Sequence, residues 1–318
     1  MGGRWWIVLV VLGVLASAQS ATPQSGDPVA ILTEIKAGQG EVRVKGATET
    51  DWKLALPLLS LRVGDQIRAT GPATAVLMFN GGQGTVTVST ANSPYMVQLR
   101  PAVAAGGKAA DLVGNLSRLL AGKKKELTYV PLATRSVKQP PLLLSPRDGK
   151  LLGAPTLEWG GSDRLRYTVR VFGPQGLVWE RADLPRAPLP YPANAPDLVP
   201  RVPYSWDLTA RDFPPQRGQF VLLSPVEAAE TQEGLAVLGQ QGYPKNTAAL
   251  LRAGFLFERE LYAEAQKELQ AATSADPDEP NLHVMLGQIY ERLGLQELAA
   301  QEYDEAQFLI SSPPTRTP

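Results

Sequence analysis

Residues 286–306 read LGQIYERLGLQELAAQEYDEA. Two small residues of this stretch, Ala299 and Ala306, are matched 34 residues earlier by Ala265 and Ala272. Tyr290 is matched in the same way by Leu256. A period of this length is typical of stacked helix pairs, in which small residues let the paired helices approach closely. The spacing therefore predicts two helix pairs, at 246–279 and 280–313.

These residues resemble the tetratricopeptide repeat (TPR) family, with Leu286-Gly287, Gly294 and Tyr303 as the clearest matches. The first copy departs from the pattern, since Arg252-Ala253 stands where the second has Leu286-Gly287. About three repeats are normally needed to bury a core. We therefore expect a further helix over 226–241 to cap the array, giving a helical TPR module over 226–310.

The resemblance implies a concave surface, lined by the first helix of each repeat, that grips peptides or helices. The matching positions in this sequence are the candidate partner-binding residues Phe257, Glu258, Val284, Gln288, Glu291 and Arg292. We expect Phe257 to be an exposed apolar anchor and Arg292 a charged contact. The alternative is that so short an array docks on a neighbouring domain or self-associates.

Residues 29–100 have a β pattern. Glu41–Lys45 and Thr85–Ser89 alternate polar and apolar residues, which is typical of half-buried strands, and Ala75–Phe79 is a continuous apolar run. Asn80–Gly84 carries the glycines that a hairpin needs. The region is therefore predicted to be a small antiparallel β-sandwich or roll.

Four segments of this region resemble the FecR-like domain family: Gly40–Val44, Trp52, Leu61–Arg68 and Ala75–Phe79. The family's namesake senses an external signal and passes it to a cytoplasmic sigma factor. Only Met1–Arg4 precede the first apolar segment here, so a cytoplasmic signalling arm is not expected. The resemblance implies a binding domain, with FecR-type signal transduction as a weaker alternative.

Residues 142–223 form a second β region. Tyr167–Val171 and Tyr204–Ala210 alternate in the manner of strands, and prolines between 185 and 200 mark a long connection. The Pro-x-Leu-x-Trp and Tyr-x-Trp patterns resemble a fibronectin type III-like or immunoglobulin-like β-sandwich. The chain is thus expected to be a multidomain β plus α protein.

The first residues resemble an export signal. Arg4 precedes the apolar stretch Trp5–Leu15, and Ala16-Ser17-Ala18 forms a small-x-small cleavage pattern. We expect a signal peptide over 1–18, a flexible stretch over 19–28, a linker with a possible short helix over 101–141, and a disordered tail over 311–318. Export would place the protein in the periplasm or outside the cell; the alternative is an anchor formed by an uncleaved N-terminal segment.

Composition excludes several classes of site. The chain has 31 basic and 31 acidic residues, no cysteine, and His283 as its one histidine. This balance argues against a nucleic-acid binder, and the absence of cysteine excludes thiol chemistry and disulfides. We find no catalytic motif and expect no enzyme activity, cofactor or metal. His283 is expected to pack within a helix pair.

The sequence therefore predicts a non-enzymatic scaffold of the cell envelope. Its partners would be envelope proteins held by the TPR groove and the FecR-like domain. The alternative is a module that binds cell-wall polymer (glycan) through the aromatic residues Trp159, Trp179 and Trp206, although such tryptophans more often lie in cores.

Overall fold

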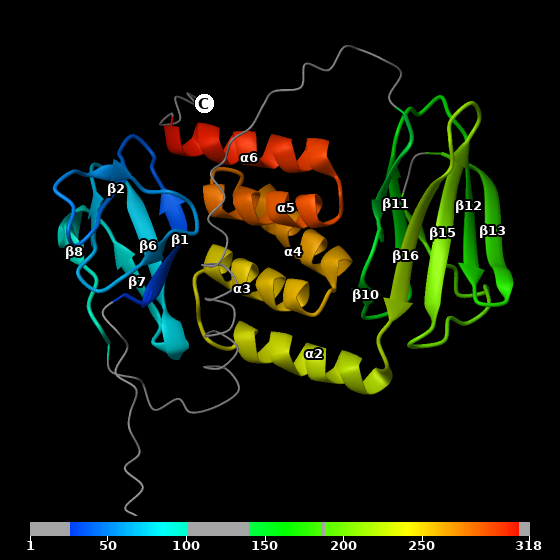
Figure 1. Cartoon of the computed structure of the whole chain (residues 1–318), viewed down its shortest axis with the longest axis horizontal. Coiled ribbons are helices and arrows are strands. Elements are labelled where there is room, and N and C mark those ends of the chain that lie inside the picture. The colour runs from blue at the N-terminus through cyan, green and yellow to red at the C-terminus, as the bar shows by residue number, and fades with distance from the viewer. Residues whose placement is uncertain (1–25, 101–139, 186–187, 312–318) are drawn as a thin grey trace, which may run out of the picture.

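The computed structural model describes residues 26–100, 140–185 and 188–311. In these residues the chain forms an N-terminal β module (β1–β8), a central β module (β9–β16) and a helical module (α2–α6). The helical module lies between the two β modules (Figure 1). The predicted signal peptide, the possible helix in the linker and the tail after 311 lie outside the described residues.

The N-terminal β module contains two four-stranded antiparallel sheets, in the orders β4-β1-β6-β7 and β3-β2-β5-β8. Its strands are β1 Ala30–Lys36, β2 Val42–Lys45, β3 Lys53–Leu54, β4 Ser60–Leu61, β5 Gln66–Ala69, β6 Thr74–Phe79, β7 Thr85–Val88 and β8 Tyr95–Met96. The glycine-rich segment predicted as a hairpin does join β6 to β7, and Gly81 and Gly84 have positive φ values of 67° and 77°.

Two further sheets make up the central β module, in the orders β10-β16-β15-β12-β13 and β14-β11-β9. Its strands are β9 Leu142–Ser145, β10 Lys150–Leu151, β11 Thr156–Gly160, β12 Tyr167–Gly173, β13 Gly176–Leu184, β14 Leu189–Pro190, β15 Pro203–Ala210 and β16 Gln216–Leu222. The pairing is antiparallel except between β10 and β16. Alternate residues of β12, Tyr167, Val169 and Val171, are fully buried, as the sequence pattern predicts.

Five helices form the described part of the C-terminal region: α2 Pro225–Gly239, α3 Lys245–Glu258, α4 Tyr262–Ala275, α5 Pro280–Arg292 and α6 Gln296–Ser311. Ser224 caps α2 through a reciprocal hydrogen-bonding arrangement with Glu227. The pairs α3/α4 and α5/α6 fall at the positions that the spacing of 34 residues predicts. The small residues Ala265 and Ala299 are both buried between helices, at 0% and 2% exposure.

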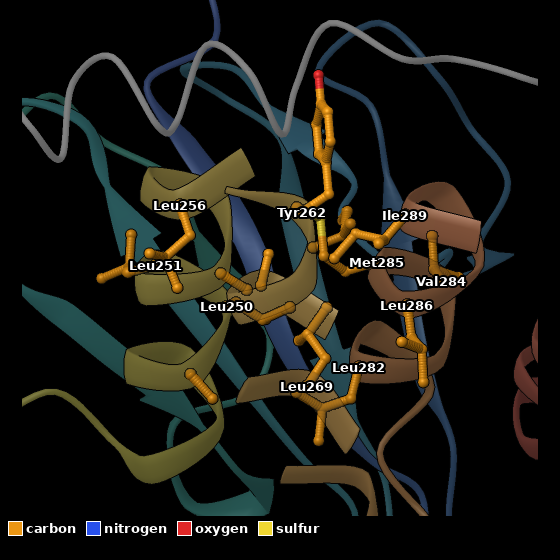
Figure 2. Close-up of a cluster of buried hydrophobic side chains, with 14 of the residues drawn as sticks. Leu250, Leu251, Leu256, Tyr262, Leu269, Leu282, Val284, Met285, Leu286 and Ile289 are labelled. Atoms are coloured by element: carbon orange, nitrogen blue, oxygen red, sulfur yellow. The ribbon is translucent and has the colours of Figure 1, made fainter. Parts of the chain in front are cut away.

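The core of the helical module extends into the N-terminal β module. Side chains of α3, α4 and α5 converge in one apolar cluster, as Figure 2 shows. Ile31, Leu58 and Met78 of the N-terminal module belong to the same cluster. Strand β1 is therefore covered on both faces, by its own module on one side and by α3 and α5 on the other.

Candidate functional site: the cleft between the helical and central modules

Each helix pair contacts the N-terminal β module at one end and the central β module at the other end. The amino-terminal ends of α3 and α5 meet β1 and the loop before β4, whereas the turns after α3 and α5 meet the loop between β9 and β10. The two contacts differ in chemistry, and this difference decides which of them can bind a ligand. We call them the N-interface and the C-interface.

Two buried carboxyl groups hold the N-interface. Glu34 of β1 accepts hydrogen bonds from the backbone N–H (2.9 Å) and the hydroxyl (2.7 Å) of Thr247 in α3. Glu279, before α5, accepts from the backbone N–H of Ile35 at 3.1 Å on each oxygen. Asn281 accepts from the backbone N–H of Leu58 at 2.6 Å.

Water is largely excluded from this network. Glu34 is 6% exposed and Glu279 is 0% exposed. Burial raises the pKa of Glu279 to about 8; hydrogen bonds from Asn281 and Ile35 oppose this shift, and the charge of Glu34 adds to it. The N-interface is thus a buried polar contact.

The C-interface is built on the loop that follows β9. The backbone N–H of Lys150 donates to the carbonyl of Glu260 (2.8 Å), and the Lys150 ammonium pairs with the Glu260 carboxylate (2.8 Å). Arg147 donates from Nε to the carbonyl of Leu293 (2.9 Å). The turns after α3 and α5 thus bind the same loop.

Gly149 is required for this close approach. Its φ is +102°, and a Cβ atom at this position would lie 2.3 Å from the carbonyl oxygen of Glu260. It would also lie 2.8 Å from the ring of Tyr262. No other residue fits without moving the helical module away from the central module.

A cleft of about 510 Å³ opens beside this contact. A volume of this size suits a small ligand or a peptide side chain, and such clefts occur preferentially between domains. It lies between β12, β15 and β16 on one side and the turns of the helical module on the other. Its charged and aromatic lining residues include Asp148, Lys150, Phe172, Glu260, Tyr262 and Arg292.

Tyr262 joins two of the residues that the sequence singled out. The Arg292 guanidinium lies 4.6 Å from the centre of the Tyr262 ring, and the Phe257 ring meets Tyr262 edge-on at 5.2 Å. Arg292 also contacts Asp148 of the central module at 3.4 Å. Burial lowers the pKa of Arg292, but Tyr262 and Asp148 raise it more.

The structure corrects the expectation that Phe257 is exposed, because its ring is half-buried and packs against the helical core. Val284 is buried in the same core, whereas Glu258 is exposed and Gln288 is half-buried. Glu291 accepts a hydrogen bond from the Tyr303 hydroxyl of α6 at 3.2 Å. Of the six candidates, Arg292 alone is among the residues that line the cleft, and Phe257 supports it from behind through Tyr262. Glu291 turns toward α6.

Sequence reasoning missed Tyr262 and Asp148. Tyr262 is the first residue of α4, outside the helices that the repeat register assigns to the groove, and its ring is 5% exposed. Asp148 belongs to a turn, which by itself indicates no site. Only the fold brings these two residues to Arg292.

The residues considered for sugar and metal binding are engaged elsewhere. Trp159 and Trp206 are buried in the central core, and Trp179 packs edge-on against Tyr191. His283 is buried as expected; its Nδ1 lies 2.7 Å from Glu302 and its Nε2 lies 2.9 Å from the carbonyl of Pro277. Within residues 26–100, 140–185 and 188–311 no group of three or more His, Cys, Asp or Glu residues is arranged to hold a metal ion.

No family model matches the chain, and a comparison with curated proteins finds no significant similarity. In the described part of the chain, none of the helices has the length and apolar character needed to cross a membrane. The proposal for function therefore rests on the geometry of the modules and on the resemblances in the sequence.

Proposed function

We propose that this protein is a non-enzymatic scaffold of the cell envelope that binds other proteins. In this proposal it is exported, the N-terminal β module is a FecR-like domain, the central module is a fibronectin III-like or immunoglobulin-like sandwich, and the helices form a TPR module. The observation that carries the proposal is the cleft at the C-interface, where Arg292 and Tyr262 of the helices face Asp148 of the central module.

The chemistry of this cleft suits recognition of a polypeptide. Arg292 is partly exposed, and Tyr262 and Asp148 hold its guanidinium at the cleft, where it can bind a carboxylate or carbonyl of a partner. Arginine is one of the residue types that most often dominate protein interfaces, and Tyr262, itself nearly buried, orients it. Two modules supply the lining, so a partner bound there contacts both at once.

The test is capture of envelope proteins by the immobilised full chain after crosslinking. Arg292→Glu should abolish capture of the partner. Arg211→Glu is the control and should still capture it, because Arg211 is an exposed arginine of the central module remote from the cleft lining. Phe257→Ala should weaken capture about thirtyfold, since loss of a supporting aromatic residue costs ~2 kcal/mol. Equal capture by all four proteins would reject the cleft as the binding site.

A further inference from the structure

The second sheet of the N-terminal β module has a face that the helical module does not cover. Strands β2 and β8 of this sheet lie on the far side of the module from the helices (Figure 1). The inner face of the sheet is defined by Val42, Ile67 and Ala69, which are buried in the module's core. Because side chains alternate along a strand, the residues between them point outward.

Three of the outward residues are basic. Arg43 of β2 is paired in register with Arg68 of β5, and Lys45 with Gln66. Directly opposed residues on neighbouring strands lie about 5 Å apart, and successive residues on one face of a strand about 7 Å apart. The three cations therefore form one compact group.

Large apolar side chains flank this group on the two edge strands. Leu54 of β3 is opposite Arg43 and is 41% exposed. Met96 of β8 is opposite Gln66 and is 49% exposed. Register places both on the same outer face as the cations.

Trp52 holds two of the cations in place. The Lys45 ammonium lies 5.2 Å from the centre of its ring and the Arg68 guanidinium 5.6 Å. Arg43 is paired with Glu41, but Lys45 and Arg68 form no ion pair with any described residue. These outward residues, Arg43, Lys45, Trp52, Leu54, Arg68 and Met96, make up the outer basic face.

We infer that the outer basic face binds the surface of a lipid bilayer that contains anionic lipids. Tryptophan is enriched at the membrane interface, and lysine and arginine near a bilayer are attracted to anionic head groups. Exposed leucine and methionine supply the apolar area that peripheral binding requires. Strands β2 and β8, which carry part of this face, lie at the end of the molecule opposite the central module (Figure 1).

The charges around the face predict the strength and salt dependence of binding. Glu41 is already paired with Arg43, and Glu49 with Lys53, while Asp51 is exposed nearby. Among the described residues, the positive charge without an ion-pair partner thus comes mainly from Lys45 and Arg68. Binding should be reversible and should weaken as salt is added, because exposed charges are screened beyond about 10 Å at 0.1 M salt.

The test is co-sedimentation of the full chain with vesicles of phosphatidylcholine alone or with about one-third phosphatidylglycerol. The wild-type protein should sediment with the anionic vesicles and not with phosphatidylcholine. Two double variants should each reduce the bound fraction about tenfold. The first, Lys45→Glu with Arg68→Glu, reverses the charge of the face. The second, Leu54→Ser with Met96→Ser, removes its apolar contact with the bilayer.

A matched control is Arg164→Glu with Arg211→Glu, which makes the same change of charge at exposed positions of the central module. This variant should bind like the wild type, and melting curves should show that all variants remain folded. Failure of the wild type to sediment, or equal loss in the control, would overturn the inference. Binding to soluble poly-glutamate with no preference for vesicles would also overturn it and would assign the face to an acidic protein.

Discussion

At the amino-terminal ends of α3 and α5 the helical module meets the N-terminal β module through two buried carboxyl groups and one partly exposed ion pair, Lys36–Asp276. On the other side it meets the central module mainly through partly exposed ion pairs, with one half-buried carboxyl group, Glu264, that accepts from the backbone N–H of Leu152. Glu279 at the N-interface is fully buried, and the Lys150 and Arg292 side chains at the C-interface are 44% and 43% exposed. One contact excludes water, and the other borders a cleft. The same pair of helices thus serves as a fixed joint at one end and as part of a binding site at the other.

The energies of the two contacts should differ accordingly. Leaving a buried donor or acceptor without its hydrogen-bond partner costs about 1–3 kcal/mol, whereas an exposed ion pair contributes about 0–1 kcal/mol. Side chains at the N-interface should therefore control stability. Side chains at the C-interface should mainly affect binding, although its backbone contact at Gly149 is tight.

The largest effect is expected from Gly149→Ala. The new methyl group would meet the Glu260 carbonyl at 2.3 Å in a backbone conformation that favours glycine, so we expect a loss of about 3 kcal/mol in unfolding free energy. The matched control is Gly153→Ala in the same region, where a Cβ would meet nothing within 4 Å. Denaturant unfolding of both variants measures the difference, and equal curves would mean that the C-interface does not form as described.

Thr247→Val should break the N-interface from the helix side. The change keeps the side-chain shape but removes the hydroxyl that donates to buried Glu34, at a cost of about 2 kcal/mol. Thr273→Val in α4 is the control, because that hydroxyl donates only to carbonyls of its own helix. If thermal melting ranked the two variants in the opposite order, the buried network would not be the stabilising feature.

Burial raises the pKa of a carboxyl group at each interface, Glu279 at the N-interface and Glu264 beside the central module, and Glu279 should dominate the pH dependence of stability. The pKa of Glu279 in the folded chain is raised to about 8 from an ordinary value of 4.5, so the folded state holds a proton that the unfolded state has lost. The contribution of this bound proton to the free energy of unfolding is fully present below pH 4.5. It falls as the pH rises toward 8, by at most about 1.4 kcal/mol per pH unit. Unfolding measured from pH 5 to 8 should show this slope in the wild type and a flatter one in Glu279→Gln.

Arg292→Ala should have the smallest effect on stability. Its ion pair with Asp148 is long and exposed, so we expect a change of less than about 0.5 kcal/mol. Calorimetric melting checks this value. A loss as large as that of Thr247→Val would mean that Arg292 is a structural residue, and the proposed cleft would lose its main binding group.

Patterns local in sequence predicted much of this fold. The spacing of Ala265 and Ala299 predicted two helix pairs because small residues at a regular period let paired helices approach closely. The equivalent repeat positions Ala253 and Gly287 also differ for a physical reason. A Cβ on Gly287 would lie 2.6 Å from the ring of Tyr303, so glycine is needed there. The first copy has Leu269 in place of Tyr303 and carries alanine at position 253. Alternation along Tyr167–Val171 predicted a half-buried strand for the same kind of local reason.

The contacts between modules could not be predicted in this way. Glu34 and Glu279 have ionisable side chains, and such a side chain is expected at the surface until its partner is known. They lie 245 positions apart in the sequence, and only docking of β1 on α5 brings both side chains to the same interface. The cleft has the same origin, since Asp148, Tyr262 and Arg292 come from three separate segments.

The central claim is that the helical module holds the two β modules at a fixed separation. The chain has no cysteine, so Thr48→Cys and Arg181→Cys introduce two labelling sites, one exposed on each β module. Pulsed electron paramagnetic resonance of the doubly spin-labelled full chain measures the distance between them. The account predicts one narrow distance distribution that broadens when Gly149→Ala is added. A broad distribution in the parent protein would show that the β modules move independently and would contradict it.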